Sequence, residues 1–512
     1  MKRNKFNLSH QINTTLQLGQ LTPVGCLEVL PGDVFNHKIS GFFRVAPTEL
    51  PIMHPTHIEF FTFFVPNRLI WDSFERFITG DDVAWPHINF DGVTAGSLAD
   101  YLGLPGIGTW AQSGVSCNAL PFRAYNLIYN EYFRDEQLGA PATISNAAGS
   151  DSSTDTDLLI AAWRKDRFTS ARPSPQIGDA VNIPLDIDGS LFTVTNTVTD
   201  PEVNPDGVFS ISNQTGSIGQ RNMVLQNEAN GLGYSGGNLG GSTNAHYFGG
   251  LSTSGTAVES SISGEAAAAI TVEQLRNSLA VQRFFERMNR SGQRYTEYLR
   301  SLGVRSSDAR LDRPEYLSHG KQTLQFDEVL QTTPATDTTL PGVGNYKGHG
   351  MGAMRSNRYV RHFNEHGILM TLAAVRPTTM YVQGAARMWF RDSYTEYFQP
   401  EFQHLGMQPV YVGEIDMKNA SDHRTIFGYQ DAYDEYRHQP SYVSGSMSQT
   451  YYKGFHFGRE FASEPSLDQG FTQCVPRADP FQIADEPEVF GMVRHSLRAR
   501  RLLRRSGKPL TL

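Results

Sequence analysis

The segment IEFFTFFV, Ile58 to Val65, decides the fold of this chain of 512 residues. Its side chains are mostly aromatic or β-branched, which favours a strand over a helix. Apolar residues fill nearly every position instead of alternate ones, and Pro66 ends the run. We therefore expect a strand that is buried on both faces.

Other segments extend this picture along the chain. Further strands are expected at residues 367–377 (GILMTLAAVRP), 380–390 (MYVQGAARMWF) and 409–415 (PVYVGEI). Helices are expected at residues 68–80, 123–139, 271–291 and 293–303, the third opening on the capping-box pair Thr271 and Gln274. Long apolar strands separated by very long connections favour a double-sheet jelly roll, because a parallel α/β fold would alternate regularly.

The composition changes between about Asn182 and Ser263, where Gly, Ser, Thr and Asn dominate. Short alternating pieces such as LFTVTNTV, residues 191–198, predict strands of a small hairpin. Few large apolar residues are available for a separate strong core. We expect four parts: residues 1–181, an inserted segment 182–270, residues 271–493 that complete the first part, and a basic tail 494–512.

The overall composition excludes several classes of protein. The net charge of −8 gives no general basic footprint for nucleic acid. Three widely spaced cysteines argue against a disulfide framework, and no run of about 18 apolar residues predicts a membrane span. Aromatic residues make up 11% and charged residues only 19%, so the chain has many rings to bury, in its own core or against neighbours.

Gly233-Tyr234-Ser235-Gly236-Gly237 matches G-x-S-x-G, the pattern of a serine hydrolase nucleophile elbow. A working elbow needs an apolar strand before the serine and a helix after it. The flanking sequence is polar and rich in glycine, and we expect neither element. An exposed loop is the favoured interpretation, and a hydrolase using Ser235 is the alternative.

Other candidate sites are interpreted as structural. His54 and His57 have i, i+3 spacing, but Pro55 lies between them, so a helical metal site is not expected. The Glu365-His366 pair lacks a second histidine at helical spacing, and the glycine-rich segment 342–352 lacks the Walker A pattern and is expected to be a loop. The adjacent acids Asp434-Glu435 and Asp485-Glu486 are expected to be solvated.

The C-terminal end is strongly basic and contains no acidic residue from position 494 onward. Two compatible interpretations are contact with a polyanion, and a solvated helix with Leu497, Leu502 and Leu503 docked on the body. The segment has no aromatic residue, so contact with DNA is expected to involve phosphates. The candidate DNA-contacting residues are Arg494, Arg498, Arg500, Arg501, Arg504, Arg505 and Lys508.

Several long blocks together carry a family resemblance. They lie at residues 29–80 (VLPGDVFNHKISGFF to FERFITG), 123–138 (RAYNLIYNEYFRDEQL), 163–176 (WRKDRFTSARPSPQ), 290–317 (RSGQRYTEYLRSLG to RPEYL), 365–377 (EHGILMTLAAVRP) and 427–445 (FGYQDAYDEYRHQPSYVSG). In this order they resemble the major capsid proteins of the Microviridae, small single-stranded DNA phages, and in particular the gokushovirus branch. The resemblance covers most of the chain outside roughly 182–270 and parts of 320–350.

The resemblance implies an eight-stranded antiparallel jelly roll with large loops between strands, several short helices and a large surface insertion. Copies are expected to form a T=1 icosahedral shell around circular single-stranded DNA, in a virion assembled in the cytoplasm of a bacterial host. The insertion is expected to form a protrusion near the threefold axes that meets a host receptor, with Tyr234, Ser235, Asn238, His246 and Tyr247 on it.

The resemblance also implies partners. They are other copies of the chain, an internal scaffolding protein, a small basic DNA-packaging protein, a pilot protein and the genome on the inner surface. No catalytic residue, cofactor, metal site or membrane insertion is expected, and a divalent cation between subunits is left open.

Overall fold

The computed structural model describes residues 3–178, 272–291, 297, 312–330, 346–404, 406–482 and 486–504, and six short strands between residues 193 and 261. The chain divides into two compact units, residues 1–179 with 284–512, and residues 180–283. The expected insertion 182–270 falls within the second unit. The expected helix at 293–303 lies outside the described residues, apart from Glu297.

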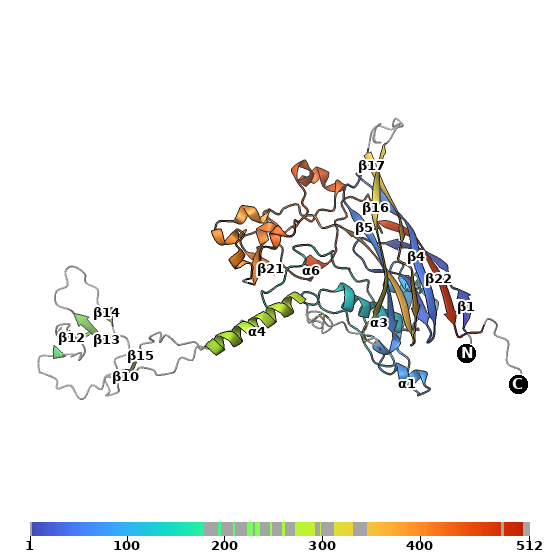
Figure 1. Ribbon diagram of the computed structural model, residues 1–512, viewed down its shortest axis with the longest axis horizontal. Helices are drawn as coiled ribbons and strands as arrows, with labels where there is room; N and C mark the ends of the chain where they lie inside the picture. The colour runs from blue at the N-terminus through green and yellow to red at the C-terminus, as the bar shows by residue number, and fades with distance from the viewer. Residues whose placement is uncertain are drawn as a thin grey trace. The chain divides into compact units, whose positions relative to one another are not determined.

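The larger unit is built on one curled antiparallel sheet (Figure 1). Its ten strands are β1 (Asn4–Asn7), β2 (His10–Leu16), β3 (Thr22–Val29), β4 (Val34–Thr48), β5 (Thr56–Pro66), β16 (Glu315–Leu330), β17 (Tyr346–Arg355), β18 (Tyr359–His362), β19 (Gly367–Pro377) and β22 (Val489–Arg501). The order is β1-β22-β4-β17-β16-β5-β19-β3, with β2 also on β22 and β18 also on β4. Because β1 and β2 pair with successive parts of β22, and β17 and β18 with successive parts of β4, the ten strands fill eight positions. The predicted mainly β, antiparallel jelly-roll class is confirmed.

The segment Ile58–Val65 forms the middle of β5, between β16 and β19. Ile58 and Phe60 pack into a core cluster within the curl of the sheet, and Phe63 and Val65 pack into a second cluster with helix α3 (Leu120–Ile128). The predicted burial on both faces is therefore confirmed. Each such buried side chain stabilises the fold by about 1.5–3 kcal/mol relative to an exposed one.

Short helices and small two-stranded sheets occupy the long connections. The helices of this unit are α1 (Phe74–Ile78), α2 (Leu98–Tyr101), α3 with a π-helical continuation (Tyr129–Phe133), the last part of α4 (Val272–Ser291), and α6 (Gln469–Thr472). The 3-10 turns are Asn67–Leu69, Arg387–Phe390, Tyr394–Glu396, Pro400–Phe402, Val412–Glu414, Asp434–Tyr436, Gly445–Ser448 and Thr450–Phe455. The small sheets pair β6 (His87–Phe90) with β9 (Val115–Asn118), β7 (Gly92–Val93) with β8 (Gly108–Thr109), and β20 (Met407–Tyr411) with β21 (Ile426–Asp431).

Helix boundaries differ from those expected. The segment 68–80 forms only a 3-10 turn and α1. The helix expected at 123–139 begins earlier, at Leu120, and ends at Phe133, because Arg134 adopts an extended backbone well before Gly139. The break expected after α4 at Ser291 agrees with its last residue.

Two strand expectations also change. The segment 380–390 is not a strand: Tyr381 forms only isolated bridges, and Arg387–Phe390 is a 3-10 turn. The segment 409–415 is a strand only as far as Tyr411, where Glu414 turns back to accept a hydrogen bond from the Tyr411 amide at 3.1 Å.

The glycine-rich segment 342–352 was expected to be a loop, but residues 346–352 belong to β17. Gly348, Gly350 and Gly352 alternate along this strand, and a Cβ on any of them would lie within 2.7 Å of Thr48, Val45 or Leu324. A side chain at these positions would have to displace neighbouring side chains, and at Gly348 also backbone atoms of Leu50 and Pro51 at 2.9 Å, so close packing favours glycine here.

The smaller unit contains two antiparallel sheets. They are formed by β10 (Thr193–Thr195) with β15 (Glu259–Ser261), and by β11 (Val208–Phe209), β12 (Met223–Glu228), β13 (Gly231–Ser235) and β14 (His246–Tyr247). A strand does occur within LFTVTNTV, but its partner β15 is distant in sequence.

Candidate nucleic-acid interface

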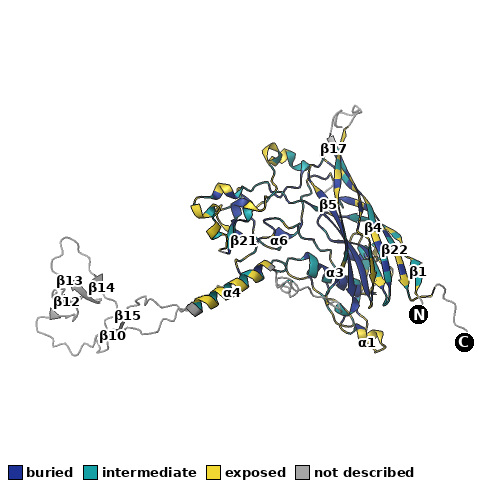
Figure 2. Ribbon diagram, in the orientation of Figure 1, coloured by how far each residue is buried: buried dark blue, intermediate teal, exposed yellow. Residues whose placement is uncertain are grey.

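Strand β22 carries the basic segment, and its residues alternate regularly between buried and exposed positions. Val493, His495, Leu497 and Ala499 are buried, whereas Arg494, Arg498 and Arg500 are exposed. The interpretation of this segment as a helix is therefore wrong, because a strand places alternate residues on opposite faces. Figure 2 shows this alternation as alternating colours along β22. The expected boundary between residues 493 and 494 falls within the strand.

The outer face of the sheet around β22 is basic. The strands β1, β2, β4, β17, β18 and β22 contain no aspartate or glutamate. Strand register places the exposed residues of β22 beside those of its neighbours: Arg494 opposite Ser40, Arg498 opposite Asn36, and Arg500 opposite Lys5. Seven exposed cations on this basic face form no ion pair within the described part of the chain: Lys5, Lys38, Arg44, Arg355, Arg494, Arg498 and Arg500.

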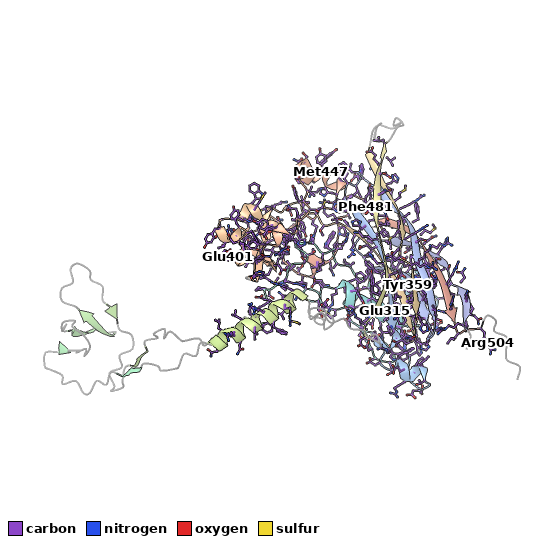
Figure 3. All side chains as sticks on the ribbon, in the orientation of Figure 1. Glu315, Tyr359, Glu401, Met447, Phe481 and Arg504 are labelled. Atoms are coloured by element: carbon purple, nitrogen blue, oxygen red, sulfur yellow. The ribbon has the colours of Figure 1, made fainter. Side chains whose placement is uncertain are left out.

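The predicted DNA-contacting residues divide into three groups. Arg494, Arg498 and Arg500 lie on the basic face, and Arg504 is exposed just beyond β22 (Figure 3). Arg501 differs, since its guanidinium pairs with buried Asp33 at 3.1 Å and donates to the carbonyl of Glu28 at 2.9 Å. Arg505 and Lys508 lie outside the described residues.

Sequence reasoning missed four cations of this face: Lys5, Lys38, Arg44 and Arg355. Lys38 and Arg44 alternate with buried Ile39, Phe43 and Val45 in β4, so a period of two was present in the sequence. What the sequence did not reveal is that β4 pairs with β22 along twelve residues, from Val34 to Val45.

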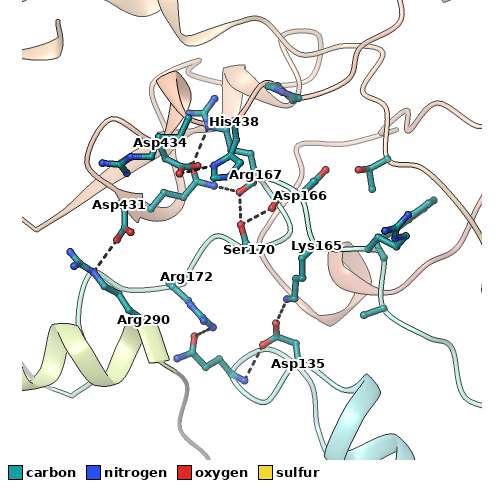
Figure 4. Close-up of a pocket in the computed structure, with 18 of the residues that line it drawn as sticks. Asp135, Lys165, Asp166, Arg167, Ser170, Arg172, Arg290, Asp431, Asp434 and His438 are labelled. Atoms are coloured by element: carbon teal, nitrogen blue, oxygen red, sulfur yellow. Dashed lines mark hydrogen bonds and ion pairs between the residues drawn. The ribbon is translucent and has the colours of Figure 1, made fainter. Parts of the chain in front are cut away.

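A second charged region is a cavity of about 1210 Å³ beside the loops that follow α3 (Figure 4). Its charges largely satisfy one another: Lys165 pairs with Asp135 at 2.5 Å, Arg290 with Asp431 at 2.9 Å, and His438 with Asp434 at 3.0 Å. Ser170 donates its hydroxyl to the carbonyls of Asp166 at 2.6 Å and Arg167 at 3.1 Å, so it is not activated by a base. These contacts hold loops together.

No serine hydroxyl bonds to a histidine ring in the described part of the chain. Ser235 ends β13, so the expectation that no strand precedes it is wrong, and the residues that follow it lie outside the described ones. Tyr234 pairs with His246 and Gly233 with Tyr247 in the hairpin of β13 and β14, whereas Asn238 lies outside the described residues.

The structural interpretation of the histidines agrees with their contacts. Buried His54 donates to the carbonyl of Thr378 at 2.7 Å, and His57 bonds to the hydroxyl of Thr323 at 3.1 Å. Glu365 pairs with Arg68 at 2.8 Å. In the described residues, no group of three or more His, Cys, Asp or Glu side chains is arranged to hold a metal ion.

We expected the acidic pair Asp434-Glu435 to be solvated, and for Glu435 this expectation is wrong. Glu435 is largely buried and pairs with Arg391 at 2.9 Å. Asp485 lies outside the described residues. All three cysteines are free, and burial raises the pKa of the Cys26 thiol to about 12. The helices that the structure describes include none long and apolar enough to cross a bilayer.

Comparison with known proteins decides the family. Residues 1–510 match the family described as capsid protein (F protein). The chain belongs to this capsid protein family. It is 33% identical to the capsid protein VP1 of Bdellovibrio phage phiMH2K, over 96% of this chain and 92% of that protein. It is 30% identical to VP1 of Chlamydia phage 1, over 95% and 92% of the two chains, and 28% identical to VP1 of Spiroplasma virus 4, over 91% and 86%.

These matches confirm the resemblance to the major capsid proteins of the Microviridae, gokushovirus branch. The capsid protein is a structural subunit of the virion that self-assembles with other copies into a shell. Strand pairing alone does not explain the basic face of this capsid protein, because seven of its exposed cations have no ion-pair partner among the described residues.

Proposed function

We propose that this capsid protein forms a T=1 icosahedral shell around a circular single-stranded DNA genome, with the basic face turned inward toward the DNA. The observation that supports the genome contact is the absence of any acid from six neighbouring strands, while seven exposed cations there lack an ion-pair partner within the described residues. Each phosphate that such a cation neutralises releases a condensed counterion, which gives affinity without sequence preference.

The test is the salt dependence of DNA binding by the purified full chain. For a single strand, the slope of log affinity against log salt is about −0.7 for each neutralised phosphate. The variant R494Q/R498Q/R500Q removes three exposed cations of β22, so we expect its slope to be less negative by about 2. Particles assembled from this variant are expected to contain less DNA.

A matched control removes three exposed cations elsewhere, in R76Q/K418Q/R437Q. This control changes the net charge equally and should leave the slope unchanged. Equal slopes for the wild type, the β22 variant and the control would show that the basic face does not contact DNA.

We also propose that the unit of residues 180–283 contains the part of the capsid protein that meets the host surface. Its support is that residues 182–270 lie within a compact unit of their own, with hairpin strands that include Tyr234, Ser235, His246 and Tyr247. Replacing residues 182–270 with a short linker is expected to leave particles intact while adsorption to host cells is lost. Loss of particle assembly in this variant would assign the segment to the shell instead.

As the family resemblance implies, an internal scaffolding protein, a small basic packaging protein and a pilot protein are the proposed assembly partners. Co-expression of the chain with each candidate gene, followed by electron microscopy, tests which are needed for uniform shells.

A further inference from the structure

Large apolar side chains are exposed in the middle of the basic face. Phe42, Phe490 and Met492 have exposed fractions of 38%, 46% and 47%. Met492 lies directly opposite Phe42, and Phe490 lies opposite Arg44, so all four side chains share one face of the sheet. The guanidinium of Arg44 lies 5.8 Å from the centroid of the Phe42 ring, within the range of a cation–π contact.

These side chains border a cleft of about 800 Å³, to which Tyr101 of α2 adds a further ring. The Tyr101 hydroxyl bonds to that of Thr15 in β2 at 3.0 Å, which fixes α2 beside the sheet. Asp100 is the acid at this cleft, and its two carboxylate oxygens accept the amides of Gly96 at 2.9 Å and Gly106 at 3.1 Å. The cleft therefore offers three aromatic rings and one guanidinium in a basic surround.

Proteins that bind single strands combine cations that follow the backbone with rings on which bases stack. We propose that this cleft binds unpaired nucleobases of the genome, which stack on Phe42 and Phe490 while Arg44 and Arg494 hold the flanking phosphates. The inference rests on the proposed function and deepens it. From the sequence, we expected contact with phosphates alone, because residues 494–512 contain no aromatic residue. The fold changes this expectation, because it brings Phe42 of β4 beside the basic strand β22.

The rings and the cations of the cleft together decide which occupant fits. An acidic protein segment could meet the cations, but it has no need of several rings around one cleft. A duplex keeps its bases stacked inside and offers none to a ring at this depth. A single strand supplies both a phosphate chain and free base faces, so it uses both features of the cleft.

The test compares two 20-mers that carry the same phosphates, oligo-dT and a fully abasic strand, binding to the purified full chain. The wild type is expected to prefer oligo-dT by about fivefold or more for each stacked base. The variant F42L/F490L keeps apolar bulk but removes both rings, and it should lose this preference while retaining the wild-type salt slope. The variant R494Q/R498Q/R500Q should retain the preference for oligo-dT and have a less negative salt slope.

The control variant F77L/W85L removes two rings outside the sheet that are exposed to a similar extent, 38% and 41%, and it should retain the preference. The comparison of the two oligonucleotides uses only the wild-type protein, so the test remains valid even if F42L/F490L does not fold. Equal salt-dependent binding of both strands would overturn base stacking and leave the proposed genome contact intact. Binding of neither strand at low salt would overturn the genome contact itself.

Discussion

At the scale of single residues, burial decides what an ion pair contributes. Arg123 and Asp151 pair at 2.7 Å with both side chains fully buried, whereas Arg76 and Asp81 pair at 2.9 Å with both well exposed. Asp151→Asn leaves a buried guanidinium without its counter-charge and should lower the free energy of unfolding by about 3–5 kcal/mol. Asp81→Asn removes the same charge at the surface and should cost less than about 1 kcal/mol. Urea unfolding of the two variants measures the difference, and similar losses would contradict this account.

Three histidine rings form a stack across neighbouring strands. His495 stacks on His10 at 4.7 Å and on His37 at 5.3 Å, and its Nε2 donates to the carbonyl of Val24 at 2.7 Å. Burial lowers the pKa of His37 to about 3 and that of His495 to about 4.

The unfolded chain therefore binds protons below pH about 6.5 that the folded chain does not bind, and stability must fall as the pH falls from 6.5 toward 4. His37 and His495 each contribute a slope of about 1.4 kcal/mol per pH unit in this window. We expect His495→Gln to flatten the dependence of the urea midpoint on pH between 6.5 and 4, whatever its stability at pH 7. His423→Gln removes an exposed histidine outside the stack that forms no side-chain ion pair within the described residues, and as the control it should not show this flattening. An unchanged slope in His495→Gln would show that the stack does not govern acid sensitivity.

At the scale of elements, the local sequence pattern predicted where strands form better than it predicted which strands pair. The apolar run of β5 and the strand β19 followed from composition alone, since each is buried on both faces. The cations of β22 suggested a tail, although Val489, Val493 and Leu497 already recur at even spacing. The pairing of β22 with β4 joins residues more than 440 positions apart, and no local pattern encodes it. For the same reason the cleft of Phe42, Phe490 and Tyr101 could not be predicted from sequence.

The alternation in β22 can be tested by two adjacent substitutions. Leu497 is fully buried in a core cluster with Phe35 and Phe363, and Arg498 beside it is exposed. Leu497→Ala should destabilise the protein by about 2–5 kcal/mol, because it removes buried methyl groups and leaves a cavity. Arg498→Ala should change stability by no more than about 0.5 kcal/mol. The urea midpoints of the two variants measure these losses of stability. A larger loss in Arg498→Ala than in Leu497→Ala would place the opposite face of β22 against the core.

At the scale of the whole molecule, the isolated subunit exposes several large aromatic side chains in one stretch of its loops. Trp389, Tyr394, Tyr442 and Tyr451, all highly exposed, lie in the loops between residues 387 and 455. Obligate interfaces are rich in such rings, and a few of them carry most of the association energy. The loops are otherwise well fixed, since the Arg391 guanidinium lies 4.6 Å from the ring centroid of Tyr436 and pairs with Glu435.

We therefore expect these loop rings to become buried between subunits when the capsid protein assembles. Trp389→Ala should abolish or strongly reduce particle formation, measured by sedimentation and electron microscopy, without lowering the thermal midpoint of the free subunit. Ile107→Ala is the control: it truncates a similarly exposed side chain outside the loops between residues 387 and 455, and it should leave the particle yield unchanged. Normal particles from Trp389→Ala would place the subunit contacts elsewhere. A lowered thermal midpoint would instead show that Trp389 supports its own loop, because a side chain that only contacts other subunits contributes nothing to the stability of the free chain.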